Sequence, residues 1–175
     1  YLEGVPAAVP QIDSVDSPAD AARMVSYWAD EGFTSFKAYM HLRGDALAAV
    51  VAAAHARHLQ VTGHLGTVSY RRAAETGIDN LEHGFFAMSD FTPNWKDDDQ
   101  PNVIAAQKAA AALDLDSPAV QGLIRLLIER KVAVTSTLAM SAALLSALAW
   151  ALGAILFRKV GEEASPAAMN LAKSL

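Results

Sequence analysis

The chain alternates helix-like and strand-like segments with short connections, and this alternation limits the folds that it can adopt. Three segments have the apolar spacing and end signals of helices: residues 17–32, 44–58 and 69–77. Each is followed by a short apolar segment bounded like a strand: FTSFKAYM from Phe33, LQVTGHLG from Leu59 and IDNLEHGFF from Ile78. Strands joined by crossover helices are parallel, so we expect an α/β fold and exclude an antiparallel one.

A fourth unit completes the strands that can be counted. Residues 117–131 are expected to form a helix that leads into a buried strand, VAVTSTLA from Val132, and the run from Leu2 to Val9 is a weaker strand candidate. A complete eight-stranded barrel needs about 250 residues, so a chain of 175 residues supplies about half of one. The pattern therefore predicts a three-layer parallel sheet or a partial (β/α)8 barrel around a single core.

Local signals mark where several helices begin. Ser-Pro pairs start two helices at Ser17 and Ser117, and Asp45 is the candidate cap of the second helix along the chain. The connection from Phe86 to Ser117 is much longer than the others and leaves the carboxyl end of a strand, where parallel sheets bind ligands. Its acidic run, Trp95 to Asp99, is interpreted as a solvated loop rather than a ligand cluster.

Charge and cysteine content exclude several classes of function. The net charge is -5 and no cluster of lysine or arginine is present, so nucleic acid is not expected as a partner. The sequence has no cysteine, so any metal must bind to nitrogen and oxygen, and the compartment is left open with the cytoplasm favoured. The chain starts at Tyr1 with no signal-peptide pattern, and we expect it to begin inside a longer parent.

The region from Val132 to Phe157 contains 26 residues without a charge, a length that would span a bilayer as one helix. A membrane anchor is nevertheless the less favoured interpretation, because the first part is expected to be a buried strand. The remainder carries an apolar stripe typical of a soluble core helix, formed by Leu144, Leu148, Leu152 and Ile155.

Three residues whose side chains could bind a metal or take part in catalysis occupy equivalent places in successive repeats: Lys37, His64 and His83. They are separated by 27 and 19 residues, one strand-to-strand step each. The carboxyl ends of parallel strands lie at one edge, so these side chains are expected to converge there. A single histidine at a strand end is usually a satisfied polar residue, but the matched pair favours a zinc site, in which two imidazoles and an oxygen donor leave room for water.

Four further side chains are weaker candidates. Tyr39 faces the same side as Lys37 by strand alternation, so it could bind substrate, although interior packing would place it equally well. His41 follows the first clear strand and could approach the same edge. His55 and His58 lie three residues apart near a helix end, where positive charge and solvent are favoured over metal binding.

Three blocks of the sequence, in order, resemble a known family: GFTSFKAYM, VTGHLGTVSYRRAAETGIDNLEHGF and VAVTSTLA. They are similar to the fourth to seventh strands of metal-dependent amidohydrolases, in the branch that includes imidazolonepropionases and prolidase-like dipeptidases. The match covers about residues 15 to 140, and TGH and NLEHGF are its most specific parts. The resemblance implies a partial TIM-type barrel over residues 1–140. The sequence no longer resembles the family after Leu138, and residues 141–175 are expected to form a separate helical C-terminal segment of unclear origin.

The resemblance also implies chemistry, namely hydrolysis of an amide, peptide or cyclic amide C–N bond by water that one or two divalent metals, usually zinc, activate. The expected substrate is a small amide or a dipeptide. Lys37 falls where the family has a lysine carboxylated on its nitrogen, and His64 and His83 fall on two metal ligands. A carbamate would neutralise cations that an unmodified ammonium would repel.

Two elements of the family pattern are absent from the sequence: the first-strand His-x-His pair and the eighth-strand aspartate. We therefore expect this chain alone to bind metal weakly and to turn over little substrate. An open half-barrel also exposes sheet edges, so self-association or a complementary barrel chain is expected. The alternative is a non-catalytic α/β barrel fragment or interaction module that retains the histidines as relics.

Overall fold

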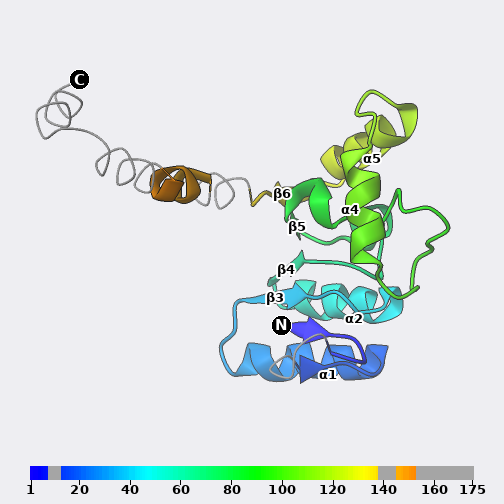
Figure 1. Cartoon of the computed structure of the whole chain (residues 1–175). Helices are drawn as coiled ribbons and strands as arrows, with labels where there is room; N and C mark the ends of the chain where they lie inside the picture. Colours follow the sequence, from blue (N-terminus) through cyan, green and yellow to red (C-terminus); the bar gives the residue numbers. More distant parts are fainter. Residues whose placement is uncertain (8–12, 138–144, 153–175) are drawn as a thin grey trace, which may run out of the picture. The chain divides into compact units, whose positions relative to one another are not determined.

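The computed structural model describes residues 1–7, 13–137 and 145–152 (Figure 1). The chain divides into two compact units, Tyr1–Ser136 and Thr137–Leu175. The proposed boundary between residues 140 and 141 stays a prediction.

The second unit is described only over its helical residues 145–152. Leu148 and Leu152 of the expected core stripe are exposed there, so the stripe is not buried at these two positions, while Leu144 and Ile155 lie outside the described residues. Within the described parts of the chain, no helix has the length and apolar character needed to cross a membrane.

The first unit contains a parallel sheet of six strands. Their spatial order is β2 (Asp13–Ser14), β1 (Leu2–Glu3), β3 (Ser35–Ala38), β4 (Gln60–Gly63), β5 (Asn80–Glu82) and β6 (Ala133–Thr135). Every neighbouring pair is parallel, which confirms the predicted α/β class and the exclusion of an antiparallel fold. The weak strand candidate in the N-terminal run corresponds to β1, and the two-residue strand β2 was not predicted.

The helices follow the strands along the chain as α1 (Pro18–Asp30), α2 (Gly44–His55), α3 (Tyr70–Thr76), the 3-10 helix η1 (Gly84–Ala87), α4 (Val103–Ala111) and α5 (Pro118–Glu129). Successive helices pack on one another: α1 on α2, α2 on α3, and α3 on α5. From β3 to β6 the strands lie side by side in sequence order, whereas the two-residue strand β2 lies on the other side of β1 (Figure 1). This singly wound arrangement is that of part of a (β/α) barrel.

Serine caps begin three of these helices, as local sequence signals indicated. The hydroxyls of Ser17, Ser69 and Ser117 each accept a hydrogen bond from a backbone N–H in the first turn. The prediction that Asp45 caps α2 is wrong, because Asp45 lies inside the first turn and the N-cap residue is Arg43, which supplies no side-chain bond. A backbone N–H at the start of α2 donates instead to a side chain of a loop distant in sequence, as described below.

Side-chain alternation along the strands separates an apolar face from a polar one. Phe36, Val61 and Leu81 are buried in the hydrophobic core that the helices cover. Lys37 and Thr62, one residue further along their strands, point to the opposite face, where the register pairs them side by side. The polar face is therefore the surface on which functional groups of neighbouring strands meet.

The strand expected at VAVTSTLA is present as β6, but among the described residues of this segment only Val132, just before the strand, is buried. All three residues of β6 are exposed, with Val134 at 44%. The physical reason is position, since β6 is the last strand of the described sheet and pairs only with β5 there. Residues 138 and 139 of that segment lie outside the described part of the chain.

Candidate functional site

Lys37, Tyr39, His64 and His83 lie together at the carboxyl edge of β3, β4 and β5, and we call them the rim cluster. The rings of His64 and His83 are 4.4 Å apart between centroids, and those of Tyr39 and His64 are 5.0 Å apart. The Lys37 ammonium lies 5.9 Å from the centroid of the Tyr39 ring. The structure thus brings together these four residues, which the sequence singled out.

Glu82, which the sequence analysis missed, lies at the centre of this cluster. Its Oε2 forms a close ion pair with the Nζ of Lys37 and lies 3.7 Å from the Nε2 of His83. Its Oε1 accepts a hydrogen bond of 2.9 Å from the hydroxyl of Thr62. Burial raises the pKa of Glu82, but the hydrogen bonds from Lys37 and Thr62 outweigh that effect and hold it below its usual value. Glu82 is therefore an ionised carboxylate at neutral pH.

The hydrogen bonds of Glu82 continue across the polar face of the sheet. Asn80 donates from Nδ2 to the Thr62 hydroxyl at 2.9 Å, and Thr135 donates to the Asn80 Oδ1 at 2.9 Å. We call the set Lys37, Glu82, Thr62, Asn80 and Thr135 the polar ladder. It joins four adjacent strands, β3 to β6, by side chains alone. Period-two alternation in NLE could have revealed Glu82, because Asn80 and Glu82 share one face.

His64 carries a neutral imidazole at physiological pH. Burial lowers its pKa to about 4, and the positive charges of His83 and Lys37 add to this effect against the opposing influence of Glu82. A neutral ring has a nitrogen lone pair available for a metal or a proton. The main chain fixes the residue as well, since the His64 N–H donates to the carbonyl of Ala38 at 3.0 Å.

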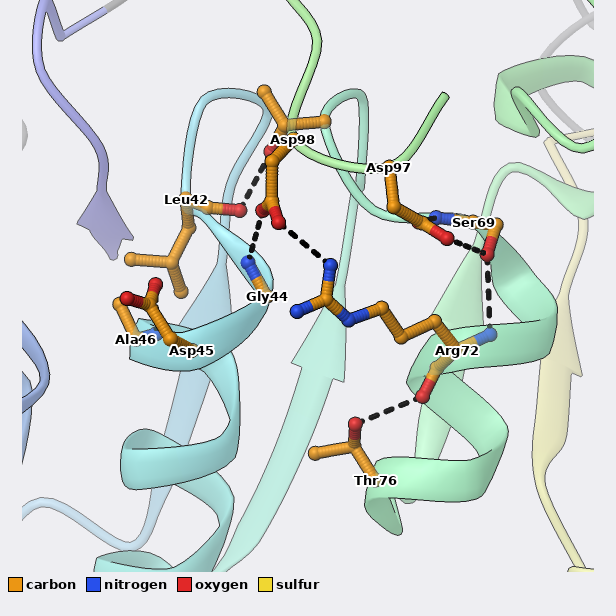
Figure 2. Close-up of polar contacts among 10 residues, drawn as sticks. Leu42, Gly44, Asp45, Ala46, Ser69, Arg72, Thr76, Asp97 and Asp98 are labelled. Carbon is orange, nitrogen blue, oxygen red and sulfur yellow. Dashed lines mark hydrogen bonds and ion pairs between the residues drawn. The ribbon is translucent and has the colours of Figure 1, made fainter. Parts of the chain in front are cut away.

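The long connection after η1 is bonded to the starts of α2 and α3 through its carboxylates (Figure 2). Asp98 accepts 2.7 Å hydrogen bonds from the Gly44 N–H, at the start of α2, and from the Arg72 guanidinium. Asp97 accepts from the N–H and hydroxyl of Ser69, the cap of α3, at 2.6 and 3.1 Å. The acidic run is a loop with Asp97 exposed, as the sequence indicated, but these two carboxylates also bond to the starts of helices, which the sequence did not indicate.

A third carboxylate of the same connection, Asp90, completes the start of α3. It accepts hydrogen bonds from the N–H groups of Tyr70 and Arg71 at 2.7 and 3.0 Å. Burial raises the pKa of Asp90 despite these bonds. The connection also contains α4, a helix that the sequence analysis did not anticipate.

The remaining histidines lie outside the rim cluster. His41 places its Nδ1 3.7 Å from the Oε2 of Glu3, a fully buried carboxylate at the end of β1 that the sequence analysis also missed. His55 contacts Asp79 at 3.0 Å on the surface, and His58 is exposed with a left-handed φ of 59°. These positions agree with the low priority that sequence reasoning gave to the last two.

The donor set of the rim cluster matches a divalent cation only in part. Two adjacent imidazoles are suitable nitrogen ligands, but the Lys37 nitrogen is an ammonium paired with Glu82 rather than an oxygen donor. Among the residues described by the structure, no group of three or more His, Cys, Asp or Glu is arranged to hold a metal ion.

Comparison with known proteins gives a fold likeness. No family model matches the sequence, and no curated protein matches it. Among solved structures, a "putative prolidase" from Bifidobacterium longum is 15% identical with a TM-score of 0.45, covering 78% of this chain and 43% of its own. An amidohydrolase is 14% identical with a TM-score of 0.42, covering 72% and 38%, and an uncharacterized protein is 15% identical with a TM-score of 0.39, covering 71% and 39%.

This chain thus spans about two fifths of the length of those proteins. The solved structures that it is similar to include amidohydrolase-like proteins, and these values do not assign the chain to a family.

Proposed function

We propose that the chain provides one part of a metal-dependent hydrolase site that cleaves an amide, peptide or cyclic amide C–N bond. The observation that carries the proposal is the convergence of Lys37, His64 and His83 at the carboxyl edge of three adjacent parallel strands. Catalytic groups of (β/α) barrels occupy this edge. The resemblance of the TGH and NLEHGF blocks to amidohydrolases gives the reaction class.

The rim cluster residues have distinct proposed roles. His64 and His83 offer imidazole nitrogens to a divalent cation, for which zinc is favoured, and a cation held there would supply Lewis-acid activation of water and of the substrate carbonyl. Lys37 would join the ligand set as a carbamate, as the resemblance implies, if its amine left the ion pair with Glu82, added carbon dioxide and released its protons to solvent. Tyr39, whose ring lies 5.0 Å from that of His64, is placed to hydrogen-bond the substrate.

Two imidazoles and one lysine are fewer donors than a tightly bound metal requires. We therefore propose that this chain alone binds zinc weakly and has little turnover, and that further donors come from a complementary barrel chain or a second copy. The substrate would be a small amide or a dipeptide.

Calorimetric titration with zinc tests the proposal. We expect the His64→Ala and His83→Ala variants to bind zinc at least about tenfold more weakly than the wild-type chain, since each loses a nitrogen ligand. His58→Ala is the matched control, because His58 is exposed and lies outside the rim cluster. Identical zinc binding by the wild-type chain and both rim variants would overturn the assignment.

A second candidate function is a non-catalytic α/β module that binds a partner. The observation that favours it is the polar ladder, in which Lys37 and Glu82 satisfy one another without a metal. Elemental analysis of the purified chain separates the two readings. One or two equivalents of metal at equilibrium with excess zinc in dialysis would support the hydrolase site, and no bound metal under these conditions would support the module.

A further inference from the structure

We propose that Tyr70 is a positioning residue for His83. It would act by holding the turn that carries this histidine in a left-handed backbone conformation. Its consequence for metal binding rests on the proposed function, whereas its effect on the backbone of His83 does not.

The carbonyls on either side of His83 share one hydrogen-bond donor. The hydroxyl of Tyr70 donates to the Gly84 carbonyl at 2.8 Å and to the Glu82 carbonyl at 3.1 Å. The Gly84 carbonyl follows His83 in the sequence, and the Glu82 carbonyl precedes it. A single phenol group therefore holds both ends of the peptide segment in which His83 lies.

This segment needs such support because of its backbone geometry. His83 has a φ of 68° and a ψ of 16°, and Gly84 follows with a φ of 59°. A glycine adopts this region freely, whereas a residue with a Cβ atom does so at a cost. Two successive left-handed residues turn the chain sharply at the end of β5, and His83 is the one that must be held there.

Tyr70 is itself fixed firmly enough to act as an anchor. Its side chain is fully buried in the core, and its N–H donates to the Asp90 Oδ2 at 2.7 Å. It is the first residue of α3, whose cap is Ser69. The hydroxyl is thus held between a helix start and a strand end, and burial raises its pKa, so it remains a donor.

The direction of the His83 ring depends on this turn. The ring lies 4.4 Å from that of His64, and its Nε2 lies 3.7 Å from the Oε2 of Glu82. Loss of the hydroxyl would leave two carbonyls without their donor and free the turn to relax towards right-handed conformations. The imidazole would then leave its place beside His64.

The first test uses the metal-free protein. Tyr70→Phe keeps the buried ring and removes only the hydroxyl, and Ser89→Ala is the matched control, since Ser89 is a buried hydroxyl donating to the Gly66 carbonyl at 2.9 Å. In NMR spectra, the backbone amide and imidazole signals of His83 should shift or broaden in Tyr70→Phe and remain in place in Ser89→Ala. Unchanged His83 signals in Tyr70→Phe would overturn the inference.

The second test is zinc titration of the same three proteins. Tyr70→Phe should weaken zinc binding by about 10–100-fold, as for other residues that orient a ligand, with Ser89→Ala within about twofold of the wild type. Equal affinity in Tyr70→Phe and the wild type would overturn the positioning role. If the wild-type chain binds no zinc, the proposed function fails and the spectra alone decide the inference.

Circular dichroism checks that each variant is folded. If Tyr70→Phe is unfolded in buffer, the spectra of all three proteins are recorded in trimethylamine N-oxide, which favours the compact state. The comparison of His83 signals then decides the inference in the same way.

Discussion

The lowered pKa of His64 makes the stability of the fold depend on pH. This pKa is lowered from 6.5 to about 4, first by burial and then by His83 and Lys37. The unfolded chain therefore binds a proton at this residue at a higher pH than the folded chain does. The stability of the fold must fall as the pH drops through the interval between these two values.

We expect protonation of His64 to leave the free energy of unfolding of the wild-type chain unchanged above about pH 6.5. Between about pH 6.5 and 4 it should lower this free energy. The decrease should be about 1–2 kcal/mol, because partial solvent exposure of the ring screens its interactions. Urea denaturation at several pH values measures it. His64→Asn should lose this part of the pH dependence and His58→Asn should keep it, and equal slopes in His64→Asn and wild type would contradict the pKa assignment.

Among single residues, those whose position follows from the strand ends could be predicted from the sequence. Lys37, His64 and His83 could be expected to converge because parallel strands share one edge. Alternation in NLE could place Glu82 on the polar face, but its ion pair with Lys37, two strands away in the sheet, could not be recognised from the sequence. The contact between Lys37 and Glu82 joins residues 45 positions apart.

At the scale of elements, helix starts with local caps were predictable and those capped from a distance were not. Ser17 and Ser69 lie next to the helices that they cap, so the signal is contained in a few residues. The start of α2 is capped by Asp98, 54 residues away. Asp45 was the only local candidate, and its carboxylate bonds instead to the adjacent N–H of Ala46.

Asp98→Ala should destabilise the fold by about 1–3 kcal/mol, because it removes the cap of α2 and the ion pair with Arg72 together. Thermal unfolding measures the loss, and Asp99→Ala is the control, since the Asp99 carboxylate accepts a hydrogen bond from the exposed N–H of Lys96 in its own loop. A loss in Asp98→Ala no greater than that in Asp99→Ala would contradict the capping role.

This contribution should also depend on pH. Burial raises the pKa of Asp98, but the bonds from Gly44 and Arg72 outweigh it and lower the pKa below 3.8. The stabilisation by Asp98 is therefore present above about pH 3.8 and lost as the pH falls through the lower folded value. The difference in stability between the wild type and Asp98→Ala should shrink accordingly in acid.

Considered as a whole, the first unit is a sheet with an exposed outer strand. All residues of β6 are exposed, and within the described residues the strand pairs only with β5. Sequence reasoning expected burial because VAVTSTLA is apolar, but burial of a strand depends on what lies beyond it. An exposed parallel edge offers unpaired N–H and C=O groups to another strand.

We expect the chain to self-associate through this edge, or to bind a complementary barrel chain. Val134→Lys should shift sedimentation velocity profiles towards the monomer, because a lysine on an edge strand opposes pairing. Lys131→Ala, at an exposed residue just before β6, is the control and should leave the profile unchanged. Identical oligomer distributions in Val134→Lys and the wild type would contradict association at β6.

The polar ladder has a direction. Thr135 donates to Asn80, Asn80 donates to Thr62, and Thr62 donates to Glu82, so each proton points towards the same carboxylate. One negative charge therefore sets the rotor angles of hydroxyls on two other strands. Protonation of Glu82 would weaken the acceptor of the Thr62 hydroxyl first, because Asn80 and Thr135 lie one and two hydrogen bonds further from the charge.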